Sequence, residues 1–253
     1  MCEPRHILIT GASSGIGAAL AEAYAGPGIR LALSGRDASR LEAVAAACRS
    51  KGATVAAEIR DVTDPEGMAG WITAREAAAP IDLVIANAGI SAGTGGGGEG
   101  AAQARRIFAV NVDGVVNTVQ PVIPFMAKRH CGQIAIVSSL ASFRGFPGAP
   151  AYCASKAAVR VYGEGLRGSL AGLGISVSVI CPGFVRSRMT EKNDFPMPLL
   201  MDAPRAAKLI VRGLARGRAR IAFPRRLYLA TLLFAMLPPG LTDGWLRRLP
   251  AKR

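Results

Sequence analysis

Histidine is scarce in this sequence and cysteine shows no pairing pattern, and each shortage excludes a class of chemistry. Only His6 and His130 occur among the 253 residues, which argues against a His-rich metal site and against a Ser-His-Asp hydrolase. The five cysteines are odd in number, scattered and free of any C-x-x-C pair. That usage is typical of a reduced cytoplasmic protein rather than a disulfide scaffold. We therefore expect neither a metal site nor a disulfide framework.

Acidic side chains are nearly absent from the last fifth of the chain. Residues 204–253 carry 12 basic side chains and 1 acidic one, against 19 and 16 in residues 1–203. The formal net charge of +14 therefore comes mainly from the C-terminal segment, and an acidic partner would bind there. We also expect no secretory signal, because the apolar run Ile7–Ile9 is short and Gly11 soon ends it.

Apolar residues make up 50% of the chain, which is enough for a core and excludes wholesale disorder. Short aliphatic runs alternate with alanine-rich stretches, which predicts a parallel sheet of strand–helix–strand units in one α/β domain. Strands are predicted at residues 6–10, 30–34, 54–60, 81–86, 133–138, 176–180 and 220–223. Helices are predicted at residues 15–25, 39–50, 65–79, 103–129, 151–171 and 204–216.

A glycine-rich turn follows the first predicted strand. Residues 10–17 read TGASSGIG and open the first predicted helix. Gly11, Gly15 and Gly17 keep the backbone small where a pyrophosphate would approach the unpaired N–H groups of a helix N-terminus. A tight structural turn without a ligand is the alternative interpretation.

A tyrosine and a lysine lie four residues apart on the helix predicted at 151–171. Tyr152 and Lys156 (YCASK) therefore share one helix face. A phenol with a pKa of about 10 is a poor acid–base catalyst at neutral pH, but a nearby ammonium group favours the phenolate and lowers that pKa. Ser139 ends the preceding strand, with Ser138 as a competing serine. Together they predict an acid–base site; a solvated helix face is the alternative for the pair alone.

Over residues 5–190 these motifs resemble those of the short-chain dehydrogenase/reductase family, including its G-x-x-x-G-x-G turn. The resemblance implies a Rossmann-like, doubly wound parallel sheet of about seven strands with helices on both faces. It implies that hydride passes between a nicotinamide and a carbonyl carbon while Tyr152 gives or takes the proton. Lys156 would lower the tyrosine pKa and hold the nicotinamide ribose, and Ser139 would orient the carbonyl oxygen.

Further motifs match the same family. Asn111, in VNVDG, resembles the asparagine whose backbone supports a proton-relay water; an asparagine that satisfies the backbone at a helix kink is the alternative. Ala86 stands where a second asparagine is common, and a serine replaces the usual threonine at position 187. The resemblance assigns the cofactor to Gly11, Ser13, Ser14, Gly15, Ile16, Gly17, Arg36, Asp61, Val62, Asn87, Ala88, Gly89, Tyr152, Lys156, Pro182, Gly183, Val185 and Ser187.

Two residues after the second predicted strand bear on the choice of dinucleotide. Asp37 lies about 20 residues past the glycines, where a general rule places the carboxylate that binds the ribose of NAD. In NAD-preferring relatives the acid follows the strand directly, where this chain has Gly35 and then Arg36. A guanidinium suits a 2′-phosphate, and Asp37 is well placed as the N-cap of a helix starting at Ala38. We predict NADP(H) as the preferred cofactor, with NAD(H) as the alternative.

A basic and apolar extension, residues 224–253, follows a single dinucleotide-binding and catalytic domain at residues 1–223. Its uncharged run Leu227–Leu237 is flanked by arginine pairs at 225–226 and 247–248, with Trp245 nearby. The 11 residues of this run would span about 16 Å as a helix, too little to cross a bilayer. The segment either packs on the core or a partner subunit, or lies on an anionic membrane. A nucleic-acid reader motif is missing, so no nucleic acid is expected.

The sequence thus favours an NADP(H)-dependent carbonyl reductase or alcohol dehydrogenase in the cytoplasm, assembled as a homodimer or homotetramer. A catalytically silent dinucleotide-binding scaffold protein is the alternative. Apolar residues after the sixth predicted strand, including Met189, Phe195 and Met201, favour a hydrophobic, lipid- or steroid-like carbonyl substrate. The competing interpretation is that these residues simply pack on the protein.

Overall fold

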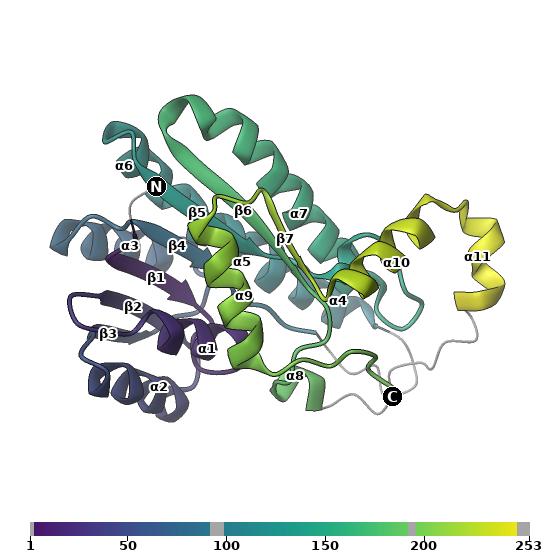
Figure 1. The fold of residues 1–253 in the computed structure, drawn as a ribbon, viewed down its shortest axis with the longest axis horizontal. Coiled ribbons are helices and arrows are strands. Elements are labelled where there is room, and N and C mark those ends of the chain that lie inside the picture. The colour runs from purple at the N-terminus through teal and green to yellow at the C-terminus, as the bar shows by residue number, and fades with distance from the viewer. Residues whose placement is uncertain (1–2, 92–98, 192–195, 247–253) are drawn as a thin grey trace.

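A single seven-stranded sheet forms the centre of the computed structural model, which describes residues 3–91, 99–191 and 196–246 (Figure 1). The strand order is β3-β2-β1-β4-β5-β6-β7, and every neighbouring pair is parallel. The strands are β1 (His6–Thr10), β2 (Arg30–Gly35), β3 (Thr54–Ile59), β4 (Leu83–Ala86), β5 (Gly132–Val137), β6 (Ile175–Pro182) and β7 (Arg220–Phe223). The predicted fold class and strand positions are confirmed, with shifts of one or two residues at several strand ends.

Helices connect the strands and follow the last of them. The α-helices are α1 (Gly15–Tyr24), α2 (Ala38–Ser50), α3 (Pro65–Ala78), α4 (Ala101–Phe108), α5 (Gly114–Val119), α6 (Ile123–Lys128), α7 (Pro150–Leu170), α8 (Arg188–Glu191), α9 (Ala203–Ala215), α10 (Arg225–Met236) and α11 (Pro239–Leu246). Short η segments are η1 (Ala109–Asp113), η2 (Gln120–Val122), η3 (Leu140–Ser142) and η4 (Ala171–Leu173).

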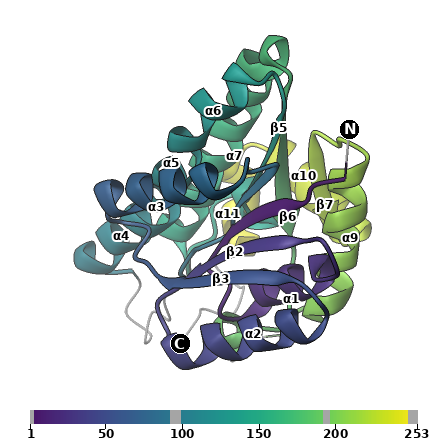
Figure 2. The same ribbon diagram turned by 90° about the vertical axis from the view of Figure 1, so that its left-hand side faces the viewer.

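Helices cover both faces of the sheet because successive strand residues point to opposite sides. Ile7 and Ile9 of β1 pack with buried residues of α1, α2 and α9 on one face. Leu8, between them, packs with buried residues of α3, α5, α6 and α7 on the other face. Figure 2 shows these two helical layers with the sheet between them. The resulting arrangement leaves the carboxyl ends of the strands along one edge, where the loops of the site begin.

The stretch predicted to be helical at residues 103–129 is helical over residues 101–128, but it is not one regular α-helix. The chain instead runs through α4, a π-helical turn (η1), α5, a 3₁₀ turn (η2) and α6. Pro121 lies in η2 and Pro124 in the first turn of α6, and each lacks the N–H that a continuous α-helix would use. The π-helical turn contains Asn111, so the helix departs from regular α-helical hydrogen bonding at that residue.

The C-terminal helices α10 and α11 lie at the end of the molecule farthest from α2 and β3 (Figure 1). Helix α10 contains most of the predicted apolar run and follows β7 after Pro224. Within the described residues, no helix combines the length and the apolar character needed to cross a membrane. Arg247 and Arg248 lie outside the described residues.

Candidate active site

A cavity of about 1480 Å³ opens at the carboxyl ends of the strands, next to the point where the strand order reverses between β1 and β4. Open α/β sheets bind their ligands at this position. The predicted site residues that line the cavity are Gly11, Ser13, Ser14, Gly15, Ile16, Arg36, Asp61, Val62, Asn87, Ala88, Gly89, Ser139, Tyr152, Lys156, Pro182, Gly183, Val185 and Ser187. Gly17 and Asn111 do not line it; both support residues that do.

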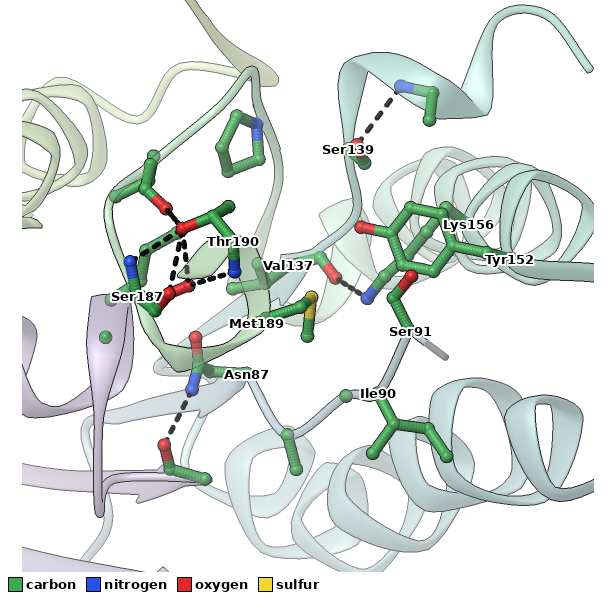
Figure 3. Close-up of a pocket in the computed structure, with 18 of the residues that line it drawn as sticks. Asn87, Ile90, Ser91, Val137, Ser139, Tyr152, Lys156, Ser187, Met189 and Thr190 are labelled. Atoms are coloured by element: carbon green, nitrogen blue, oxygen red, sulfur yellow. Dashed lines mark hydrogen bonds between the residues drawn. The ribbon is translucent and has the colours of Figure 1, made fainter. Parts of the chain in front are cut away.

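The glycine turn between β1 and α1 is held by a side chain from the end of β4. Asn87 Nδ2 donates to the carbonyl oxygens of Thr10 and Gly11, at 2.9 and 3.1 Å; Figure 3 draws one of these two bonds. Gly11 and Gly15 have φ angles of +66° and +57°, in the left-handed region that favours glycine. A Cβ at Gly17 would collide with the Gly11 carbonyl and the Asn87 amide. Gly17 therefore allows the turn to close.

The first turn of α1 offers hydrogen-bond donors at the cavity wall. Its N–H groups have no acceptor within the helix, and the N-cap residue Ser14 makes no side-chain hydrogen bond to them. The turn carries no acidic side chain that would repel an anion. Free N–H groups at the positive end of a helix dipole fit the pyrophosphate of a dinucleotide.

Arg36 and Asp37 are neighbours at the cavity edge but differ in their partners. Asp37 is the N-cap of α2, as predicted: its Oδ1 accepts from the Arg40 N–H at 3.0 Å and from the Ser39 hydroxyl at 2.9 Å. Its other oxygen pairs with the Arg40 guanidinium at 2.8 Å. The backbone hydrogen bond from Arg40 and the hydroxyl of Ser39 lower the pKa of Asp37. Arg36 is exposed and forms no salt bridge within the described part of the chain.

Arg36 is one of several arginines at this end of the cavity. The sequence motifs did not reveal the others, which are Arg40, Arg60, Arg106 and Arg188. Arg36 and Arg106 act electrostatically on Asp61, whose pKa is lowered first by a hydrogen bond from the Thr63 N–H. These arginines come from separate loops and helices, so only the fold brings their side chains to one cavity.

Ser139 and Tyr152 meet on one wall of the cavity, from the end of β5 and the first turn of α7 (Figure 3). Ser139 is the N-cap of η3, and its Oγ accepts from the Ala141 N–H at 3.1 Å. Burial raises the pKa of the Tyr152 phenol, and a hydrogen bond with Ser139 opposes that rise. In the polypeptide alone, Tyr152 is therefore a neutral phenol at neutral pH and holds a proton at its hydroxyl oxygen.

Lys156 points into the same cavity one turn after Tyr152. Its Nζ donates to the Val137 carbonyl at 3.0 Å and lies 6.0 Å from the centroid of the Tyr152 ring. Burial lowers the pKa of Lys156 from 10.5 to about 8. The expected lowering of the tyrosine pKa by Lys156 is not found in the polypeptide alone, because loss of water around the phenol outweighs the effects that oppose it.

Ser138 and Asn111 hold the catalytic helix in place. The Ser138 hydroxyl donates to the Lys156 carbonyl at 2.7 Å, so this serine anchors α7 while Ser139 faces Tyr152. Asn111 is fully buried: its Oδ1 accepts from the Ile90 N–H at 2.8 Å, and its Nδ2 donates to the Ile90 carbonyl at 2.9 Å. The same Nδ2 donates to the Ser155 hydroxyl at 3.0 Å. Asn111 thus ties the loop after β4 to α7.

The segment after β6 forms the opposite wall of the cavity. The Thr190 hydroxyl accepts from the Ser187 N–H at 2.8 Å, which holds Ser187 against the glycine turn at Gly15. Met189 lines the cavity, as the prediction of an apolar wall requires. Met201 instead is buried in the core and pairs with Val185 through an isolated β-bridge, so it packs on the protein. Phe195 lies outside the described residues.

Helix α10 contributes residues that the motifs did not assign to the site. Leu227 and Thr231, one turn apart, line the cavity beside Pro182 and Gly183. A Cβ at Gly183 would lie 3.1 Å from the Leu227 side chain, so the small residue leaves room for α10. The C-terminal extension is therefore part of the cavity wall.

Comparison with known proteins gives a consistent result. The family model described as short chain dehydrogenase matches residues 5–196. A Myxococcus xanthus protein named "Uncharacterized oxidoreductase" is 41% identical over 246 residues, which cover 97% of each chain.

Two solved structures are similar over nearly the whole chain. A short-chain dehydrogenase from Sphingobium yanoikuyae in complex with NADPH has a TM-score of 0.80 and 29% identity, covering 98% of this chain and 97% of that one. A short chain dehydrogenase/reductase from Burkholderia phymatum in complex with NAD has a TM-score of 0.82 and 26% identity, covering 99% and 98%. One neighbour therefore binds NADPH and the other NAD.

Proposed function

This chain belongs to the short-chain dehydrogenase family, and we propose that it is an NADP(H)-dependent oxidoreductase for a hydrophobic carbonyl or secondary alcohol substrate. The family's oxidoreductases act on CH–OH or C=O groups with a nicotinamide dinucleotide. The observation that carries the proposal is the convergence of Ser139, Tyr152 and Lys156 on the cavity that the glycine turn also lines. A silent scaffold has no need of such a constellation, so that alternative finds no support.

The three side chains have separable roles in the proposal. Ser139 and Tyr152 together hold the reacting oxygen, since their hydroxyls already share a hydrogen bond at one wall. Tyr152 gives its proton to that oxygen during reduction and takes it back during oxidation. Lys156 binds the ribose next to the nicotinamide and supplies positive charge as Tyr152 loses its proton. The nicotinamide, when bound, supplies or accepts the hydride.

The preference for NADP(H) rests on the arginines at the adenosine end. Arg36 has no salt-bridge partner among the described side chains and is available to a 2′-phosphate, whereas both oxygens of Asp37 are engaged by α2. Asp61 and Val62 would contact the adenine beside them. NAD(H) remains the alternative cofactor.

A hydrophobic substrate is supported by the side chains on the substrate side of the cavity. Leu140, Met189 and Leu227 line the cavity that Tyr152 also lines, and they come from three different segments. Apolar walls of this kind favour a lipid-like or steroid-like ketone over a sugar.

The larger-scale expectations remain part of the proposal. They are a dinucleotide-binding and catalytic domain at residues 1–223 with an extension at 224–253, a homodimer or homotetramer, and a cytoplasmic location with peripheral membrane contact. The described cysteines, Cys48, Cys131, Cys153 and Cys181, are all free, as suits a reducing compartment.

The decisive experiment replaces the proton donor and keeps the fold. With Tyr152→Phe, NADPH-dependent reduction of a ketone series should fall by at least about 100-fold, because the transferable proton is lost. Binding of NADPH, measured by nicotinamide fluorescence, should remain close to wild type. Tyr162→Phe is the matched control, since Tyr162 lies on the same helix but bonds to Gln120 and does not line the cavity. Retained turnover in Tyr152→Phe would refute the role.

A further inference from the structure

Helix α10 has two apolar faces, and only one of them packs on other parts of the described protein. On the inner face, Leu227 and Thr231 line the cavity, and the Tyr228 ring packs on Phe143 with centroids 5.6 Å apart. The Tyr228 hydroxyl also accepts from the Arg220 guanidinium at 3.0 Å. These contacts fix which side of α10 faces the protein.

The loop that follows Ser139 strengthens this attachment. Phe143 lies beneath the guanidinium groups of Arg160 and Arg220, which are 4.7 and 5.2 Å from its ring centroid. The next residue, Arg144, stacks over Phe234 of α10 at 5.6 Å and donates to Thr242 of α11. Rotation of α10 to bury its other face would break its contacts with Phe143, Arg144 and Arg220.

Among the residues that the structure describes, the outer face of α10 is therefore left without a partner. Leu229, Leu233 and Met236 follow each other at helical spacing and are 59%, 68% and 81% exposed. Leu237 and Leu241, which follow in the chain, are also exposed, so five of the ten large apolar side chains exposed among the described residues belong to this one segment. We call these five residues the outer stripe. A single scattered leucine needs no explanation, but a stripe of this kind indicates an interaction surface.

The charges around the outer stripe indicate what covers it. Arg225 and Arg226 are exposed at the first turn of α10, directly beside the stripe. A second copy of the chain would bring its own net charge of +14 and, within residues 204–253, a single acid to pair with these arginines. An anionic lipid surface supplies both a negative charge for the arginines and an apolar layer for the leucines.

We propose that the outer stripe docks on an anionic lipid bilayer, with α10 lying in the plane of the interface. A 12-residue helix with no polar outer side chain beyond its first turn suits that position, whereas it is too short to cross. Because the inner face of α10 lines the cavity, docking places the cavity wall next to the lipid. Delivery of an apolar substrate by this route rests on the proposed function; the docking itself does not.

The experiment measures binding of the full chain to vesicles by co-sedimentation. Wild-type protein should bind vesicles of phosphatidylcholine mixed with an equal amount of phosphatidylglycerol more tightly than vesicles of phosphatidylcholine alone. Leu233→Glu should weaken binding to the mixed vesicles by about tenfold or more, since one leucine is withdrawn from the apolar layer and a like charge is added. Replacing Arg225 and Arg226 together by Gln should weaken it by about fivefold per arginine, and only on the mixed vesicles.

Two controls separate docking from damage to the fold or loss of turnover. Leu209→Glu, at a partly exposed leucine of α9, should leave vesicle binding unchanged. Binding of NADPH by each variant reports folding without requiring a substrate. Vesicle binding without ketone reduction would support the docking and contradict the proposed function. Ketone reduction without vesicle binding would support the proposed function and contradict the docking.

Two results would overturn the proposal. One is equal or absent binding of wild-type protein to both kinds of vesicle. The other is a Leu233→Glu variant that binds vesicles like wild type but sediments as a smaller oligomer in solution. That second result would show that another copy of the chain covers the outer stripe.

Discussion

Replacing Arg36 tests the choice of dinucleotide more directly than any other single substitution. In Arg36→Ala, the guanidinium proposed to bind the 2′-phosphate is lost, and the first turn of α2 keeps its Asp37 cap. NADH has no 2′-phosphate, so its use should change by less than about twofold. The ratio of kcat/KM for NADPH to that for NADH is therefore the quantity to measure.

The expected size of the effect follows from where Arg36 lies. Hydrogen bonds to charged groups contribute about 1.5–3 kcal/mol, which corresponds to roughly 10- to 150-fold in kcat/KM. Arg36 is exposed, so solvent screens the interaction, and Arg40, Arg60 and Arg106 keep part of the positive charge at the cavity edge. We therefore expect the lower end of the 10- to 150-fold range, so the ratio of kcat/KM for NADPH to that for NADH should fall by about tenfold.

Steady-state rates with each dinucleotide, at one fixed ketone concentration, give the ratio for wild type and variant. Arg49→Ala is the matched control, because Arg49 lies on α2 but pairs with Glu42 and does not line the cavity. An unchanged ratio in Arg36→Ala, or equal losses with both dinucleotides, would refute the assignment of Arg36 to the 2′-phosphate.

Three further outcomes are expected. The free energy of unfolding of Lys156→Met, measured by denaturant titration, should exceed that of wild type near neutral pH, because a protonated amine buried in the fold destabilises wild type there. This difference should shrink between pH 8 and 10.5, because the pKa of Lys156 is about 8 in the folded protein and 10.5 for an ordinary lysine. A difference that stays constant with pH would contradict burial as the cause of the lowered pKa. Gly17→Ala should displace the Asn87 amide, destabilise the fold by about 1–3 kcal/mol and weaken NADPH binding at least about tenfold. An affinity for NADPH equal to that of wild type, measured by calorimetry, would contradict the close packing of the turn. Phe143→Leu should lower the free energy of unfolding by about 1–2 kcal/mol, because its ring loses contact with two guanidinium groups. The same substitution should weaken the attachment of α10, which hydrogen exchange would detect as faster exchange of the amides in that helix. Unchanged exchange would show that other contacts hold α10.

Local features of the chain could be predicted from the sequence because they depend on residues close to one another. Alternating aliphatic and alanine-rich runs are enough to place strands and helices. The glycines of residues 10–17 indicate a turn that requires positive φ, and Gly11 and Gly15 adopt it. Asp37, two residues after β2, was predicted to cap a helix and does so. Each of these depends on a handful of consecutive residues and on rules that hold in any fold.

The site depends instead on residues brought together from distant parts of the chain. Ser139 was already preferred to Ser138 from the sequence, but what Ser138 does instead is visible only in the structure, where its hydroxyl donates to the Lys156 carbonyl. The arginines around Arg36 have no shared motif, and Leu227 reaches the cavity only because α10 packs beside Gly183 at the end of β6. Spacing alone predicts that Tyr152 and Lys156 are neighbours, but not how much water surrounds them.

Burial also explains why the pKa of Tyr152 is raised, although the neighbouring Lys156 was expected to lower it. A pKa depends on how far the group is removed from water and on every charge and dipole around it, and both are properties of the packed molecule. The sequence therefore determined which groups could do acid–base chemistry, and the fold determined their protonation: a phenol whose pKa is raised and a lysine whose pKa is lowered to about 8, both by burial. The outer stripe of α10 follows the same division, since the apolar run is evident in the sequence, while only the packing of Tyr228 and Phe234 decides which of its leucines face solvent.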